Sequence, residues 1–132
     1  MSSFHLQIVT PDGLFFDGEA ESLDVRATTG GVTILPRHIN YVTPLGMGVA
    51  TVKTKGKVRK AACIGGMLAM TNGAFKLIAT TFEWAEDIDQ ERARSALARA
   101  QETLKNKERL SDAELQLAEA KLRRALVRTS LG

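Results

Sequence analysis

The 132-residue sequence has few aromatic side chains, and its last third has none. All seven aromatic residues lie at or before Trp84, all three prolines at or before Pro44, and ten of the eleven glycines at or before Gly73. Residues 87–132 instead hold ten Lys or Arg and eight Asp or Glu among many alanines. Because such a segment has no large side chain around which to build a core, the sequence excludes two domains of the same kind.

Cysteine and long apolar runs are also scarce. The single cysteine, Cys63, has no partner for an internal disulfide, which is usual in a reducing compartment. No apolar run approaches the roughly 20 residues that cross a bilayer, and the first residues show no signal-peptide pattern. We therefore expect a soluble intracellular protein. The net charge of +3 is too small, and too well mixed with acids, to indicate nucleic-acid binding by itself.

The sequence motifs of common catalytic sites are missing. There is no phosphate-binding P-loop, no Gly-x-Ser-x-Gly elbow and no His/Cys cluster with metal-ligand spacing. His5 and His38 are predicted to be structural or solvated, and Cys63 to be a small buried hydrophobe. Asp87 and Asp89 could form a carboxylate pair, but helix capping explains them more simply. The chain alone is therefore predicted not to be an enzyme, with no catalytic residue and no metal ligand.

Residues 1–86 show short alternating segments separated by turn signals. Thr-Pro-Asp-Gly at 10–13 predicts a tight turn, and further turns are expected at Asp17-Gly18, 28–31, Lys55-Gly56 and 71–73. Gly65-Gly66 interrupts a strand pattern and indicates a bulge or a close backbone approach. Strands at this spacing without helices between them predict an antiparallel sandwich or barrel.

After Trp84 the apolar period becomes helical. Asp87 and Gln90 resemble a capping box, as do Ser111 and Glu114, and each pair precedes an amphipathic stretch. The predicted stripes are Ala93, Leu97, Ala100 and Leu104, then Leu115, Ala118, Leu122 and either Ala125 or Leu126. Two such helices form an antiparallel hairpin. Because alanine buries little area, this hairpin should be marginal without a partner or ligand.

Four arginines have a spacing that could place them together. Arg92 and Arg99 lie two turns apart on the first predicted helix, and Arg124 and Arg128 lie one turn apart on the second. If the hairpin folds back, these guanidinium groups can converge near its open end and grip phosphate oxygens. Asp89 could accept hydrogen bonds from Arg92 or from a nucleotide. The alternative is that all of them form intrahelical ion pairs on solvated faces.

Several short motifs occur in an order that resembles a known family. Thr-Pro-Asp-Gly at 10–13 precedes Ile-Leu-Pro-Arg-His at 34–38, Gly65-Gly66, Ala-Glu-Asp-Ile-Asp at 85–89 and an alanine-rich helical pair. Over essentially the whole length they resemble the epsilon subunit of the bacterial rotary (F-type) ATP synthase. The resemblance implies an α+β fold, with an N-terminal antiparallel β-sandwich of about ten strands (1–84) followed by a C-terminal antiparallel two-helix hairpin (85–132).

The resemblance also implies a function. In that family the sandwich binds the gamma subunit and the membrane ring of c subunits. The helices alternate between a compact hairpin and an extended form that reaches the alpha/beta catalytic ring and inhibits ATP hydrolysis. We therefore expect a non-catalytic central-stalk subunit of the proton-translocating ATP synthase, which couples rotation to ATP synthesis and restrains hydrolysis. It would be peripheral on the cytoplasmic face of the bacterial cell membrane, attached only through the complex.

Some family members bind ATP on the compact hairpin through an Ile/Leu-Asp-x-x-Arg-Ala motif, which is complete here at residues 88–93. The resemblance implies ATP contacts from Glu83, Ile88, Asp89, Arg92, Ala93, Arg99, Arg124 and Arg128. ATP would be a regulatory ligand, with or without Mg²⁺, and no catalytic cofactor is implied. When ATP falls, the opened pair could offer basic side chains to acidic surface on the catalytic ring, namely Arg109, Lys121, Arg123, Arg124 and Arg128.

Two alternatives remain at this level. One is a stand-alone β-sandwich with a helical adaptor for RNA or another protein. Against RNA, the aromatic residues are confined to the predicted sandwich, so no basic face with interleaved aromatics is available to stack bases. The other alternative is the same ATP synthase subunit without ATP sensing, in which the arginines act only through their charge.

Overall fold

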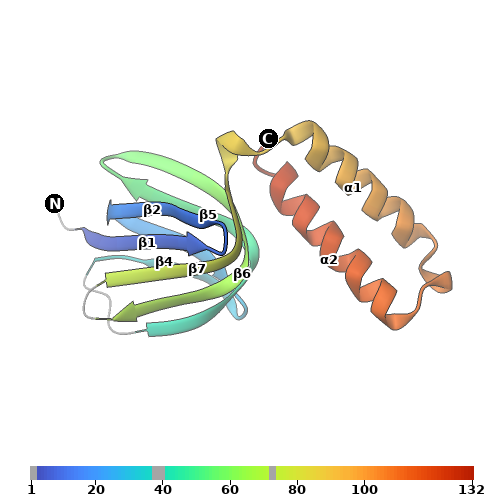
Figure 1. Cartoon of the computed structure of the whole chain (residues 1–132), viewed down its shortest axis with the longest axis horizontal. Helices are drawn as coiled ribbons and strands as arrows, with labels where there is room; N and C mark the ends of the chain where they lie inside the picture. Colours follow the sequence, from blue (N-terminus) through green and yellow to red (C-terminus); the bar gives the residue numbers. More distant parts are fainter. Residues whose placement is uncertain (1–2, 37–40, 72–73) are drawn as a thin grey trace. The chain divides into compact units, whose positions relative to one another are not determined.

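The computed structural model describes residues 3–36, 41–71 and 74–132, and the chain divides into two compact units, Met1–Trp84 and Ala85–Gly132 (Figure 1). The first unit consists of strands β1 Phe4–Thr10, β2 Gly13–Ala20, β3 Ser22–Ala27, β4 Gly30–Ile34, β5 Tyr41–Thr54, β6 Lys57–Thr71 and β7 Ala74–Trp84. The second contains η1 Ala85–Asp87, α1 Gln90–Lys105, η2 Lys107–Arg109 and α2 Asp112–Thr129, where η denotes a 3-10 helix.

The seven strands form one hydrogen-bonded sheet in the order β2-β1-β7-β6-β5-β3-β4. The pairs are antiparallel except β1 with β7, which is parallel. The first part of β7 pairs with β1, whereas the second part of β5 pairs with β3. The long strands β5, β6 and β7 therefore run from one layer of the sandwich into the other, and Figure 1 shows them curving between the layers.

The bend in the long strands lies at glycines. In β6, Gly65 and Gly66 have φ angles of 69° and 123°, which favour glycine. A Cβ atom on Gly66 would lie 2.1 Å from the carbonyl oxygen of Ile78 on β7. The close backbone approach predicted for this pair is therefore confirmed, and no side chain fits at Gly66.

The bend also accounts for the strand count. The sequence led us to expect about ten strands, and the described part of the chain has seven. Each of the three long strands contributes to both layers without a loop, so a count by layer would register each of them twice. The backbone pairing of β5 with β6 continues on both sides of the glycines. One irregular residue in each strand is therefore enough to turn the sheet.

One apolar core fills the space between the layers. Edge-to-face contacts cross from β2 to the end of β7, where Phe15 lies 5.6 Å from Phe82 and Phe16 lies 6.4 Å from Trp84, between ring centroids. The largest fully buried side chains are Phe75, Phe82, Leu6, Ile8, Leu23, Ile34, Leu68, Leu77 and Val52. Aromatic and branched aliphatic side chains of the first unit thus supply the core that the alternating sequence pattern predicted.

The predicted turns have different outcomes. The turn at 10–13 is confirmed, since β1 ends at Thr10, β2 begins at Gly13, and Thr10 Oγ1 accepts a hydrogen bond from the backbone N–H of Asp12 at 3.0 Å. The two-residue turns after β3 and at Lys55-Gly56 are also confirmed. The Asn72-Gly73 turn lies outside the described residues.

The turn predicted at Asp17-Gly18 is wrong. Strand β2 continues through it, with Asp17 opposite Gln7 and Gly18 opposite Leu6 of β1. β2 is at the edge of the sheet. Asp17 projects its carboxylate to His5 Nε2 at 2.8 Å. A cross-strand partner thus overrides the local turn preference of Asp-Gly.

The second unit is an antiparallel helical hairpin, as predicted. Ser111 and Glu114 form the expected capping box at the start of α2, with both reciprocal hydrogen bonds present. The capping box expected at Asp87 and Gln90 is wrong, because Asp87 belongs to η1 and the N-cap of α1 is Asp89. The buried residues of the two helices are Ala93, Ala100, Ala118 and Ala125, so the helices pack through small side chains. Leu126 is exposed, which settles the last stripe position in favour of Ala125.

Candidate functional site

The start of α1 holds the Ile-Asp-x-x-Arg-Ala motif. Asp89 is the N-cap, and its Oδ1 accepts a hydrogen bond from the backbone N–H of Arg92 at 3.0 Å. The backbone carbonyl of Asp89 also accepts from the N–H of Ala93 at 3.0 Å. Ile88 and Ala93 are buried, whereas Asp89 and the side chain of Arg92 are exposed. The motif therefore builds the first turn of the helix and leaves one carboxylate oxygen and one guanidinium group available to a ligand.

Gln90 joins this first turn to the end of α2. Its side-chain Nε2 donates a hydrogen bond to the backbone carbonyl of Arg128 at 2.9 Å. That carbonyl lies in the last turn of α2, where it also accepts a hydrogen bond from the backbone N–H of Leu131 at 3.2 Å. The contact fixes the open end of the hairpin, so that the start of α1 lies beside the end of α2.

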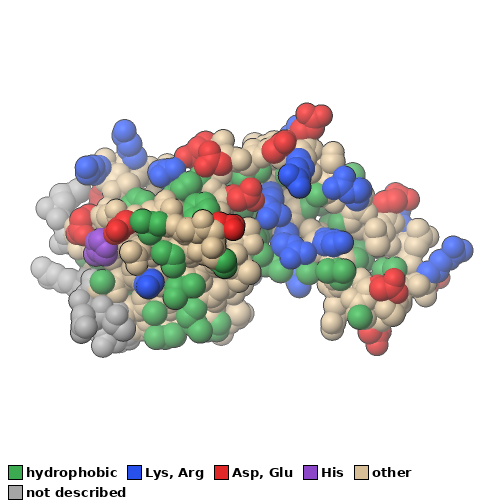
Figure 2. All heavy atoms as spheres, in the orientation of Figure 1, with side chains coloured by type: hydrophobic (Ala, Val, Ile, Leu, Met, Phe, Trp, Pro, Cys, Tyr) green, Lys and Arg blue, Asp and Glu red, His purple; other side chains and the backbone are tan. Residues whose placement is uncertain are grey.

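A groove of about 510 Å³ runs between the two helices. Its walls combine alanine, leucine and threonine side chains with a set of charged ones. The lining residues with charge are Arg99 on α1 and Glu114, Lys121, Arg124 and Arg128 on α2. Figure 2 shows Lys and Arg side chains gathering over the helical unit. The groove is thus an apolar channel with four cations and one carboxylate.

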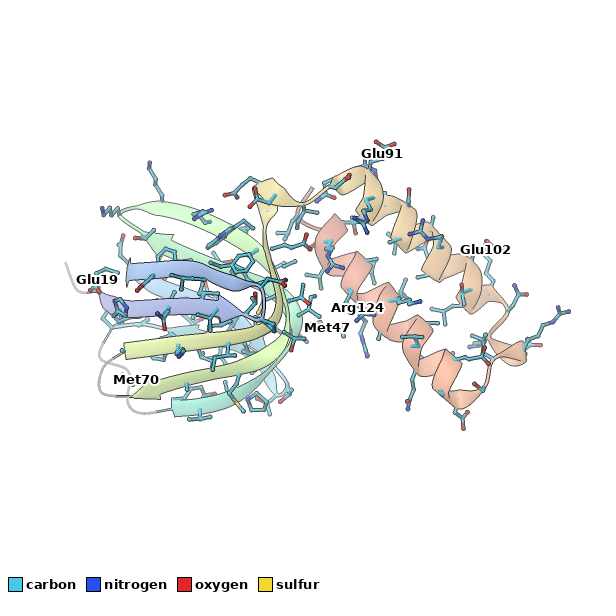
Figure 3. The ribbon with its side chains drawn as sticks, viewed as in Figure 1. Glu19, Met47, Met70, Glu91, Glu102 and Arg124 are labelled. Carbon is cyan, nitrogen blue, oxygen red and sulfur yellow. The ribbon has the colours of Figure 1, made fainter. Side chains whose placement is uncertain are left out.

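Two cations of the groove, Arg99 and Arg124, are not neutralised by the hairpin itself. Within the described residues, Arg99 and Arg124 make no ion pair, so the alternative of intrahelical ion pairs does not hold for them. The acidic side chains of α1 labelled in Figure 3, Glu91 and Glu102, lie on the side of α1 away from α2. Like charges one turn apart on α2 repel each other, so an anion bound beside them would relieve that repulsion.

Glu114, the one carboxylate of the groove, is engaged in helix capping. Hydrogen bonds from the backbone N–H and the hydroxyl of Ser111 lower the pKa of this carboxyl below its ordinary value. Glu114 therefore stays ionised and hydrogen-bonded to Ser111, at the end of the groove near the interhelix connection.

The structure brings together three of the eight residues that the resemblance assigned to ATP. Arg99, Arg124 and Arg128 line the groove. Ile88, Asp89, Arg92 and Ala93 lie at the start of the same helix pair, and Arg92 does not line the groove. Glu83 belongs to the other unit, on β7 opposite Ala62 of β6.

Sequence reasoning missed two residues of this region as contributors to the site. Lys121 lies three residues before Arg124 and seven before Arg128, a helical spacing that could have added it to the groove. Gln90 occupies a variable position of the motif, and nothing in the local pattern indicated that its amide reaches the other helix.

The other candidate groups lie in the sandwich. His5 contacts two carboxylates across the edge strands, with Nε2 at 2.8 Å from Asp17 and Nδ1 at 3.4 Å from Glu19. Cys63 is buried, and this burial raises the pKa of its thiol to about 12. It is a small buried hydrophobe, as predicted, rather than a nucleophile.

The described ranges 3–36, 41–71 and 74–132 contain neither a metal-binding cluster nor a membrane-spanning helix. No group of three or more His, Cys, Asp or Glu side chains is placed to hold a metal ion there. None of the helices in these ranges has the length and apolar character needed to cross a membrane.

Comparison with known proteins gives matches along the whole chain. Residues 3–85 match the family model "ATP synthase, Delta/Epsilon chain, beta-sandwich domain", and residues 86–130 match the "ATP synthase, Delta/Epsilon chain, long alpha-helix domain". A relative from Bacillus velezensis, named ATP synthase epsilon chain, is 41% identical over 128 residues, covering 97% of this chain and 96% of its own. Another of that name, from Caldanaerobacter subterraneus, is 36% identical over 130 residues, covering 98% and 93%.

The fold is also found in solved structures. A chain in the cryo-EM structure of the Euglena gracilis mitochondrial ATP synthase, OSCP/F1/c-ring, superposes with a TM-score of 0.84 at 19% identity, over 98% of this chain and 81% of that one. The two family models match consecutive parts of the chain, and the named relatives align over nearly its whole length. The chain belongs to the ATP synthase delta/epsilon chain family.

Proposed function

We propose that this chain couples rotation to ATP synthesis in the central stalk of a proton-translocating ATP synthase, and that its helical hairpin restrains ATP hydrolysis under the control of bound ATP. The chain is a non-catalytic subunit, as its named relatives indicate. The observation that carries the regulatory part is the groove, in which Arg99, Arg124 and Arg128 converge between two helices whose fully buried residues are all alanine.

The proposed mechanism is a ligand-dependent equilibrium between closed and open hairpins. In the closed pair the groove cations repel one another, and a polyphosphate would neutralise them. ATP favours the closed form only by the difference between its affinities for the two forms. Because the groove needs residues from both helices, opening the pair separates Arg99 from Arg124 and Arg128 and removes the site. The released basic face of α2 would then be available to acidic surface on the catalytic ring.

The sandwich offers a surface for docking in the stalk. Val9, Ile78, Met67 and Pro44 are consecutive neighbours across β1, β7, β6 and β5 in the strand register. Ile78 is 46% exposed and Met67 is 42% exposed, so this row is an apolar band on the outside of the sheet. Such bands mark interaction sites on soluble proteins. We propose that the gamma subunit docks on this row, with the c ring as a second partner of the same unit.

Calorimetric titration of the full chain with ATP tests the nucleotide site. We expect saturable heat in the wild type and at least tenfold weaker binding in Arg124→Gln with Arg128→Gln, because two charge-assisted contacts are lost. Arg123→Gln on the outside of α2 is the matched control and should bind as the wild type does. Absence of heat at millimolar ATP, with and without Mg²⁺, would leave the subunit without ATP sensing.

Co-purification tests the docking surface. The variant Ile78→Lys places a charge in the apolar row and should reduce recovery of the chain with gamma and the c ring, while Lys76→Ala on the same face of β7 should not. Retention of Ile78→Lys in the complex at the wild-type level would show that gamma binds elsewhere on the sandwich.

A further inference from the structure

Lys121 is a groove cation to which neither the sequence motif nor the resemblance gave any part in ATP binding. We infer that Lys121 contacts the terminal phosphate of a nucleoside triphosphate in the groove and thereby sets the preference for ATP over ADP. The inference rests on the proposed function and adds a specificity residue to it.

The cations of α2 form one row. Lys121, Arg124 and Arg128 are spaced by three and four residues, so they share a face of the helix, and all three line the groove. At a rise of about 1.5 Å per residue, Lys121 lies about 10 Å along the axis from Arg128. Arg99 faces this row from α1. The row therefore has a direction, from the open end of the hairpin toward the interhelix connection.

The position of the motif at the open end of the hairpin determines the direction in which a bound nucleotide lies along this row. The amide of Gln90 bonds to the carbonyl of Arg128, which puts the motif residues Ile88 and Asp89 beside the end of α2. A nucleoside bound at the motif leaves its phosphate chain to run along the groove. The first phosphates meet Arg128 and Arg124, and only the phosphate farthest from the nucleoside reaches Lys121, which Arg99 faces from α1.

The groove beyond Lys121 is unsuited to more phosphate. Leu117, Ala118 and Leu110 line it there, followed by the carboxylate of Glu114. Glu114 is held ionised by its capping box, so it repels an anion that extends past Lys121. The sequence of cations, apolar wall and carboxylate thus limits the length of the phosphate chain. Lysine suits the last position because its mobile ammonium can follow a terminal phosphate.

Titration calorimetry of ATP and ADP on the full-length wild type and three variants tests the inference. Lys121→Gln should weaken ATP binding by about tenfold, the loss of one charge-assisted contact, and change ADP binding by less than about twofold. Lys121→Arg should restore the preference for ATP. Arg123→Gln also removes one positive charge from α2, but it is exposed and outside the groove, so it should alter neither affinity.

The outcomes separate the inference from the proposed function. If Lys121→Gln weakens ATP and ADP equally, or if Arg123→Gln has the same effect, the contribution of Lys121 is general charge and the inference is wrong while ATP binding stands. If the wild type binds no ATP, the proposed ATP site and the inference both fail. A selective loss for ATP in Lys121→Gln, restored by arginine, supports both.

Discussion

The carboxylate of Asp89 has a structural role as a helix cap and a proposed role as a ligand contact. Its Oδ1 caps α1 through the backbone N–H of Arg92, and the proposed ATP site also includes it. A carboxylate has enough acceptor sites for both partners, so capping and ligand binding do not exclude each other. The two contributions differ in what they require, because a cap needs an oxygen acceptor while a ligand contact can require the charge.

Substitutions at Asp89 separate these contributions. Asp89→Ala should lower the free energy of unfolding of the hairpin by about 1 kcal/mol, because the N-cap is lost, whereas Asp89→Asn should nearly retain it. Helical circular dichroism during urea unfolding measures this. Asp87→Ala in η1 is the control and should change stability by less than about 0.5 kcal/mol. If Asp89→Asn is as stable as the wild type but binds ATP more weakly, the charge itself contacts the ligand.

Gly66 gives a prediction for the sandwich. Gly66→Ala should destabilise the first unit by about 3 kcal/mol, because its Cβ would meet the Ile78 carbonyl oxygen and its φ of 123° is strained for alanine. Gly31→Ala in β4 has open space around it and should be neutral or mildly stabilising. Fluorescence of Trp84, the single tryptophan, follows the unfolding. Equal stability of the two variants would contradict the close approach.

The sequence predicted the structural roles of those single residues whose roles depend on neighbouring positions. The irregular backbone at Gly65-Gly66, the strand alternation that buries Cys63 and the Ser111–Glu114 box are each signalled by residues within a few positions. The bond from Gln90 to Arg128 spans 38 positions and has no such local signal. Side-chain contacts of this range depend on how the helices pack, which a periodic pattern does not specify.

The helical hairpin, as an element, depends on its caps and a thin interface. Its buried residues are alanines, which contribute little area, so hydrogen bonds at the helix ends are a large share of what holds it. The capping box at the start of α2 is one of these. Since its Glu114 carboxyl has a lowered pKa, the hairpin should respond to acid.

The pH dependence has a defined sign. A carboxyl whose pKa is lower in the folded state adds stability above its unfolded value, near 4.5, and this contribution is lost as pH falls through the folded pKa. Helical ellipticity should therefore decrease as the pH falls below this unfolded value, and less so in Glu114→Gln, whose amide keeps the cap without titrating. Identical acid profiles for the two proteins would show that other carboxylates account for the loss.

Elements were predictable where local pattern and long-range pairing agree. The helices have a clear apolar period, and the hairpins at 10–13 and Lys55-Gly56 have a clear turn sequence. In each case the neighbouring element pairs with the one predicted. Asp17-Gly18 resembles a turn locally, but pairing of β2 with β1 keeps it extended. The seven strands differ from the expected ten because continuity through a glycine bend is a property of the whole sheet.

The whole molecule consists of two units with very different cores. One is built from aromatic and branched side chains between two layers, and the other from alanines between two helices. The groove residues Arg99, Arg124 and Arg128 belong to the second unit. A ligand of that groove should therefore act on the stability of one unit and leave the other nearly unchanged.

Thermal unfolding tests this independence. The ellipticity at 222 nm should fall at a lower temperature than the change in Trp84 fluorescence, because the hairpin buries less apolar area. ATP at about 100 times its dissociation constant should stabilise the hairpin by about 2.7 kcal/mol and leave the tryptophan transition in place. Coincident transitions, moved together by ATP, would show that the two units unfold as one.

The long strands of the sandwich have a mechanical consequence. Because β5, β6 and β7 pass from one layer into the other without a loop, the layers cannot slide past each other unless backbone hydrogen bonds of the same ladder break together. A pulling force along these strands loads many bonds in parallel, whereas a force across an edge pair such as β1 and β2 would open one bond after another. In the proposed central stalk, the sandwich would therefore resist deformation, with compliance confined to the edge strands.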